Sequence, residues 1–111
     1  MEEDIELYVC STASMKLHIY TSAGTTEVDL DFRPRALTFI NDTYYAIGGH
    51  LALSVEIRQK ENNEVVYNID VRDNVSSLGA SPDGHHLCVG MDGGLLLSAH
   101  MISIKSLMLL R

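Results

Sequence analysis

Four side chains of the kinds that bind zinc lie close together in the sequence: Asp83, His85, His86 and Cys88. Zinc requires three or four nitrogen, sulfur or oxygen ligands that converge on one point. Adjacent residues of a strand point to opposite faces of a sheet, so His85 and His86 do not easily converge. His86 and Cys88 could share a face, but a zinc site would still need distant ligands. The pattern favours a polar turn beside a cysteine, and we expect no metal and no other cofactor.

The usual signatures of nucleophilic catalysis and of phosphate binding are missing from the sequence. A catalytic Ser or Cys needs a His beside it and an acid behind it, and these residue types are too frequent here to indicate a site. No Gly-x-Ser-x-Gly segment occurs, and the Gly pairs at 48–49 and 93–94 lack the Lys-Ser/Thr of a phosphate-binding loop. His50, directly after the first pair, is expected at a solvated turn. We predict that the protein is not an enzyme.

Two groups of residues could instead form a binding surface. Glu27, Asp29 and Asp31 alternate with apolar residues and would share one face of a strand. They could form a calcium site or a stripe that faces a partner, although such charges more often line a solvated strand and discourage edge pairing. Tyr44 and Tyr45, beside a predicted turn, could lie at a binding rim or pack in the core. These patterns assign no binding residue by themselves.

Composition and charge narrow the class of protein. The chain has 111 residues, of which 46% are hydrophobic and 21% charged, which is typical of one globular domain. The formal net charge is −7, with 15 acidic and 8 basic residues. A chain without a cluster of Lys and Arg is a poor candidate for binding a phosphate backbone. We expect protein partners and no nucleic acid.

The cysteines and the two ends bear on cellular location. Cys10 and Cys88 each lie inside an apolar run, as small buried residues of a protein in a reducing compartment do. The acidic N-terminus does not resemble a signal peptide. The apolar stretch 95–110 contains His100 and Lys105 and is shorter than the ~20 residues of a membrane span. These features predict a cytoplasmic protein with no membrane segment.

The elements that would position these residues are strands. Val28, Leu30 and Phe32 alternate with the three acidic residues, and the same period of two recurs at 17–19, 53–57 and 65–71. Turn signals separate these runs at 22–24, 41–42, 48–49, 62–63, 73–74, 82–84 and 92–94. Short strands with frequent turns predict an all-β antiparallel protein.

The strands also repeat. The stretches 8–11, 45–48 and 87–90 are each a small apolar strand, and they recur at intervals of about 40 residues. Four strands per unit at this period are typical of a propeller blade. We predict three outer strands at 5–11, 16–21 and 26–32. A complete blade follows at 35–40, 43–47, 51–58 and 64–71, and a third opens at 75–80, 86–90 and 95–98. A β-sandwich of about eight strands is the alternative.

The segment 80–94, ASPDGHHLCVGMDGG, resembles the WD-repeat pattern, although the chain has no Trp and therefore no Trp-Asp dipeptide. In a blade, Asp83-Gly84 and Asp92-Gly93 would form the turns on either side of one strand, because Gly tolerates a positive φ and Asp bonds its own backbone. The predicted fold is thus all-β: an incomplete propeller of about two and a half antiparallel, four-stranded WD-repeat blades. These blades span 5–32, 35–71 and 75–99 within a partial propeller at 1–99.

Within the WD-repeat class, the segments 18–28, 36–49 and 75–84 resemble the actin-interacting protein 1 family near the start of its second propeller. The resemblance implies a non-catalytic protein-interaction module that acts with cofilin to disassemble actin filaments, in the cytoplasm or at the actin cytoskeleton. No actin-contacting or cofilin-contacting residue of the family can be matched to a position here. The segment 89–96 is also similar to blade ends of nucleolar ribosome-assembly propellers, so a scaffold fragment of another complex is the alternative.

The chain departs from the family in its length and in its C-terminal tail. Residues 100–111 form an atypical apolar tail without blade alternation or turn residues, as a splice or reading-frame change would append. The sequence therefore indicates a fragment or truncated form. Repeat architectures need about three units and capped ends, so open blade faces should make the chain associate with itself or with another protein. Exposed apolar contacts are expected at Phe32, Leu53, Val55 and 95–97.

Overall fold

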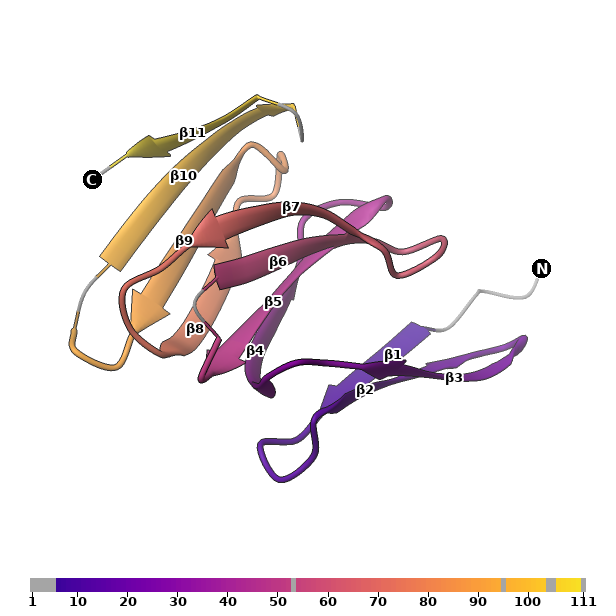
Figure 1. Cartoon of the computed structure of the whole chain (residues 1–111). Coiled ribbons are helices and arrows are strands. Elements are labelled where there is room, and N and C mark those ends of the chain that lie inside the picture. Colours follow the sequence, from indigo (N-terminus) through magenta and orange to yellow (C-terminus); the bar gives the residue numbers. More distant parts are fainter. Residues whose placement is uncertain (1–5, 53, 95, 104–105, 111) are drawn as a thin grey trace.

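The protein consists of three antiparallel sheets that follow one another along the chain (Figure 1). The computed structural model describes residues 6–52, 54–94, 96–103 and 106–110, and no helix occurs among them. The first sheet contains β1 (Glu6–Cys10), β2 (Lys16–Thr21) and β3 (Gly24–Asp29). The second contains β4 (Arg33–Phe39), β5 (Tyr44–His50), β6 (Ser54–Gln59) and β7 (Val65–Asp70). The third contains β8 (Val75–Ala80), β9 (His86–Met91), β10 (Leu96–Ser103) and β11 (Ser106–Leu110).

Each sheet is a meander in which sequential strands pair, and the sheets meet through their early strands. Strand β8 packs against β4 and β5, and β4 contacts β1 and β2. Strands β4 and β8 are the inner edges of the second and third sheets, and β7 and β11 are the outer edges (Figure 1). Successive antiparallel sheets stacked in this way are those of a partial propeller, which confirms the predicted fold class.

Two apolar clusters hold the sheets together. One joins the first and second sheets through fully buried side chains that include Leu17, Tyr45 and Ile47. The other joins the second and third sheets around Val55 and Val89. Both clusters are built by the alternation seen in the sequence, since every second residue of a strand faces the neighbouring sheet.

Aromatic rings close the junction between the first and second sheets. The ring of Tyr8 lies edge-on to those of Phe39 and Tyr45, with centroids 4.9 Å and 5.1 Å apart. The buried Tyr45 hydroxyl donates to Asn63 Oδ1 at 2.8 Å, and burial raises the pKa of Tyr45 far above its usual value. The Lys60 ammonium lies 4.5 Å from the centroid of the Phe39 ring. Tyr45 is thus a core residue, and its neighbour Tyr44 is half-buried.

The predicted turn at Gly48-Gly49 is wrong, because both glycines lie inside β5. A Cβ on Gly49 would stand 2.0 Å from the carbonyl oxygen of Arg33, and one on Gly48 would stand 3.2 Å from Val75. The β4–β5 pairing also shifts register between Pro34 and Ala36. Glycine is therefore used here for the close approach of neighbouring backbone at a bulge and not for a turn.

The predicted turns on either side of β9 are confirmed. The backbone N–H of Gly84 donates to Ser81 at 3.0 Å, and that of Gly94 donates to Met91 at 3.0 Å. Gly84 and Gly94 have φ angles of 73° and 79°. The second turn thus uses the later glycine of its pair for the positive φ, where the sequence had indicated Gly93.

Strands also occupy part of the C-terminal stretch that was predicted to lack blade character. Strand β10 extends through Ser103, and β11 pairs with it so that the third sheet has four strands. These two strands form a hairpin whose pairing shifts register between Met101 and Ser103. No Gly, Pro, Asn or Asp marks a turn between these two strands, so the sequence does not predict the fourth strand.

Burial corrects several expectations about apolar residues. Phe32 and Val55, expected to be exposed, are 4% and 0% exposed because each belongs to an inter-sheet cluster. Leu53 and Leu95 lie outside the described residues, and so do the side chains of 96–97. Cys88 is exposed and not buried, because Leu87 and Val89 take the inward positions of β9, and Cys10 is half-buried. None of the described residues forms a helix of the length and hydropathy that a membrane crossing requires.

Candidate functional site

Five connections lie at one end of the sheets, which we call the cleft end. They are the β1–β2, β5–β6 and β9–β10 turns and the β3–β4 and β7–β8 linkers. The up-and-down order of the strands places all of them there, because each of these connections follows a strand that runs toward this end. An open cleft of about 410 Å³ lies among them and is lined by Thr12, Ala13, Arg33, Arg35 and His50.

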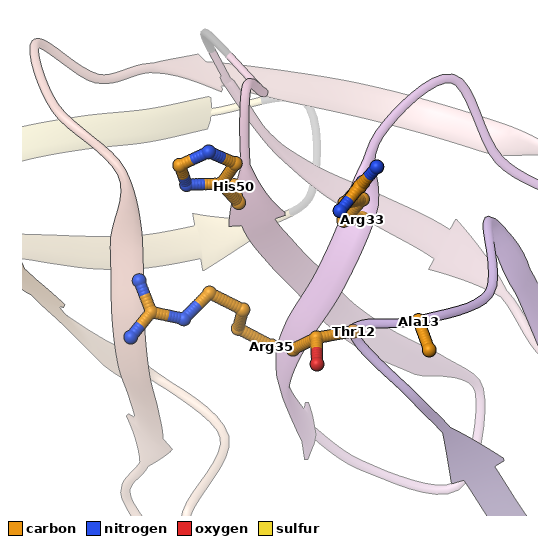
Figure 2. A pocket seen from close by; sticks show the side chains of 5 residues that line it. All are labelled: Thr12, Ala13, Arg33, Arg35 and His50. Atoms are coloured by element: carbon orange, nitrogen blue, oxygen red, sulfur yellow. The ribbon is translucent and has the colours of Figure 1, made fainter.

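The side chains of the cleft come from three segments that the fold brings together (Figure 2). Thr12 and Ala13 belong to the β1–β2 turn, Arg33 and Arg35 begin β4, and His50 ends β5. Arg33 and His50 are directly opposite each other in the antiparallel register. Residues paired in this way have Cβ atoms about 4.5–5.5 Å apart on the same face.

One of the two arginines is held by an ion pair with the third sheet. The Arg35 guanidinium donates from Nη1 to Asp92 Oδ1 at 2.9 Å and to Oδ2 at 2.8 Å. Figure 2 shows its side chain extending away from Arg33. Arg33 is exposed and forms no ion pair within the described part of the chain. The cleft therefore contains one neutralised and one unneutralised guanidinium.

The Asp73-Asn74 linker fixes the turns around this end. The Asp73 carboxylate accepts from the backbone N–H of Gly93 at 2.8 Å, and Asn74 Oδ1 accepts from that of Leu51 at 2.9 Å. The Asn74 carbonyl also accepts from the backbone N–H of Asp92 at 3.0 Å. These bonds tie the second and third sheets together, so Asp92 is positioned for Arg35 by backbone as well as by charge.

The four residues of zinc-binding type, at 83, 85, 86 and 88, lie at the opposite end of the sheets, in and after the β8–β9 turn. The Asp83 carboxylate accepts hydrogen bonds from the Ser81 hydroxyl and from the backbone N–H of His85, and these bonds lower the pKa of Asp83 below its usual value. His86 Nδ1 lies 4.0 Å from Asp83 Oδ1. Among the described residues, no three His, Cys, Asp or Glu side chains are grouped to hold a metal ion. The geometry is that of a turn stabilised by its own polar groups.

Ser81, Asp83 and His86 do come together, but not in the order that a nucleophilic triad requires. The Ser81 hydroxyl donates to the Asp83 carboxylate and accepts from the backbone N–H of His86 at 3.0 Å. In a triad the hydroxyl donates to the imidazole, and the acid orients the imidazole from behind. The lowered pKa of Asp83 also makes it a weaker base. This arrangement stabilises the turn and gives no support to acyl-transfer chemistry.

The acidic stripe on β3 is partly neutralised by its neighbour β2. The Lys16 ammonium lies 3.3 Å from Glu27 and 3.9 Å from Asp29, and His18 Nδ1 lies 3.6 Å from Glu27. These are exposed cross-strand pairs, which add little stability. The stripe is thus a solvated face with internal partners, and Asp31 is exposed beyond the end of the strand.

Sequence reasoning found only one member of the cleft, His50, and placed it at a solvated turn. It is instead half-buried at the end of a strand. The spacing of Arg33 and Arg35 was a usable signal, since residues two apart share a strand face. The pairing with His50 required the β4–β5 register, which depends on the bulge between Pro34 and Ala36.

No protein-family model matches the chain, and no curated protein is significantly similar to its sequence.

Proposed function

We propose that the protein is a non-catalytic interaction module of the WD-repeat type. The observation that carries this proposal is the cleft end, where turns and linkers from three sheets meet around a basic cleft in an acidic chain. Strands fix the positions of three cleft residues, Arg33, Arg35 and His50, as a binding surface requires. The Asp83 turn, in contrast, lacks the donor and acceptor order of a catalytic group.

The partners proposed are actin and cofilin. This part of the proposal rests on the resemblance of the segments 18–28, 36–49 and 75–84 to the actin-interacting protein 1 family. The role would be to promote cofilin-dependent disassembly of actin filaments by binding, in the cytoplasm. A module of the same fold that serves as a scaffold in another complex would share the cleft end but would not respond to cofilin.

Co-sedimentation with actin filaments tests the partner. The purified chain, shown by circular dichroism to be folded, is centrifuged alone, with filaments and with filaments saturated by cofilin. We expect the fraction of the chain in the pellet to increase with filaments and cofilin above both other samples. A folded chain that stays in the supernatant in all three samples would contradict the actin proposal and leave a scaffold for another partner.

A further inference from the structure

We propose that the basic cleft binds a carboxylate group carried by an acidic segment of a partner protein. The inference deepens the proposed function, since it rests on the chain being an interaction module, but it does not depend on actin or cofilin. The ligand class follows from the charge, the geometry and the surroundings of the cleft.

The cleft offers hydrogen-bond donors on a rigid frame. Arg33 and His50 face the same side as a register pair, and Arg35 follows Arg33 two positions later. Pro34 is buried between the two arginines, and the close approach of the Gly49 backbone fixes the spacing of β4 and β5. The donors are therefore held in place before a ligand arrives, which reduces the entropy lost on binding.

The cleft contains one arginine whose positive charge is not paired with a carboxylate of the described residues. Arg35 is occupied by Asp92, whereas Arg33 has no carboxylate partner in the part of the chain that the structure describes. Two lysines of the first two sheets do have carboxylate partners: the exposed Lys16 pairs with Glu27, and the half-buried Lys60 pairs with Glu6. A guanidinium presents a planar fork of N–H donors that matches the two oxygens of a carboxylate. The unneutralised fork of Arg33 is thus the recognition element.

A protein carboxylate fits this site better than a nucleic acid does. A nucleic acid backbone requires several cations along its path and is repelled by an acidic surface. The chain has a net charge of −7, and its basic residues are scattered. An open cleft of about 410 Å³ with one free guanidinium matches a single carboxylate, or two adjacent ones, on a flexible segment.

The test measures binding of a short labelled peptide with two adjacent glutamates by fluorescence anisotropy. The same peptide with glutamines instead of glutamates is the ligand control. Arg33→Gln removes the recognition element, and because Arg33 is exposed and forms no ion pair within the described residues, the variant should fold normally. Arg72→Gln is the matched control: Arg72 is exposed in the β7–β8 linker and does not line the cleft. Thermal unfolding of both variants checks their folding.

We expect the wild-type chain and Arg72→Gln to bind the glutamate peptide equally and the glutamine peptide not measurably. Arg33→Gln should weaken binding at least about tenfold, because the hydrogen bonds of the guanidinium to the carboxylate are lost. Equal losses in both variants, equal binding of both peptides, or no binding by the folded wild-type chain would each overturn the proposal. Normal peptide results with no actin pelleting would reject only the actin function. Actin pelleting with unchanged peptide binding by Arg33→Gln would reject only the carboxylate site.

Discussion

At the scale of single residues, the space that the neighbouring backbone leaves decides which residue type fits a position. Gly49 is the clearest case, because the space that a Cβ would need is occupied by the Arg33 carbonyl oxygen at 2.0 Å. The main chain of β4 cannot withdraw without breaking the strand pairing that also positions Arg33 and His50. The glycine is therefore required by packing and not by its backbone angles.

Gly49→Ala should lower the free energy of unfolding by about 3 kcal/mol, since inserting an atom into occupied space forces the backbone to shift. Gly79→Ala is the control, because a Cβ there has no neighbour within 4 Å and the residue is exposed in β8. Urea unfolding followed by circular dichroism measures both variants. Equal midpoints for the two would show that β4 and β5 are not in close contact at Gly49.

The charge of Asp83 is also set by local groups. Hydrogen bonds from Ser81 and from the His85 backbone lower its pKa below 3.8. A group whose pKa is lowered by folding stabilises the folded state above its unfolded pKa, and this contribution is lost as pH falls through the lower folded value. We therefore expect the wild-type chain to lose stability more steeply below about pH 3.8 than Asp83→Asn does.

Urea unfolding at a series of acidic pH values compares the two proteins. Ser81→Ala is the informative partner variant: loss of its hydroxyl should raise the pKa of Asp83 toward 3.8, which a carboxyl carbon NMR titration reads directly. An unchanged Asp83 titration in Ser81→Ala would show that the Ser81 hydrogen bond does not set its charge.

At the scale of elements, the connections add polar bonds between sheets whose strands are already joined by apolar clusters. The linker Asp73-Asn74 bonds to two turns, and Arg35 of β4 reaches Asp92 in the turn after β9. The side chains of Arg35 and Asp92 are 31% and 39% exposed, so solvent and salt weaken their attraction. This ion pair orients Arg35 within the cleft more than it holds the sheets together.

A double-mutant cycle with Arg35→Gln and Asp92→Asn should give a coupling energy of about 0.5–1 kcal/mol, typical of a partly exposed ion pair. The coupling should fall when the unfolding experiments are repeated in 1 M salt, where the Debye length is about 3 Å. Glu27→Gln with Lys16→Gln, an exposed pair at 3.3 Å, is the reference cycle and should couple more weakly. Additive effects of the Arg35 and Asp92 changes would contradict a direct interaction.

At the scale of the whole molecule, the first sheet has one face on the second sheet and one face exposed. Leu7, Val9 and Tyr20 are 56%, 40% and 43% exposed, and Leu7 and Tyr20 are register partners. Together they form an apolar strip along β1 and β2. A strip of this kind favours association with another apolar surface. We therefore still expect self-association, but through this strip and not through Phe32 and Val55, which are buried.

Sedimentation equilibrium should therefore show reversible association of the wild-type chain. Leu7→Ser should weaken it about tenfold, because burial of a leucine is worth about 1.5–3 kcal/mol. Leu51→Ser is the matched control: Leu51 is 71% exposed but lies in the β5–β6 turn, away from the strip. A monodisperse monomer at all concentrations would rule out association through this face.

The sequence by itself determined the fold class, most strand positions and the two turns around β9. These depend on neighbours in the chain: the alternation of Val28, Leu30 and Phe32 assigns their face, and Asp-Gly pairs fix turns through local backbone preferences. The sequence-based prediction was wrong at Gly48-Gly49, because glycine occurs both in turns and where two backbones approach closely. Only the facing strand β4 distinguishes the two cases.

The tertiary structure alone decided the candidate site. Thr12, Arg33 and His50 are far apart in the sequence and meet because the β4–β5 register and the stacking of three sheets bring them to one end. The register depends on a bulge between Pro34 and Ala36, and the unpaired charge of Arg33 depends on Asp92 binding Arg35 instead. Both are properties of contacts between distant segments, which periodicity and turn chemistry along the chain do not encode.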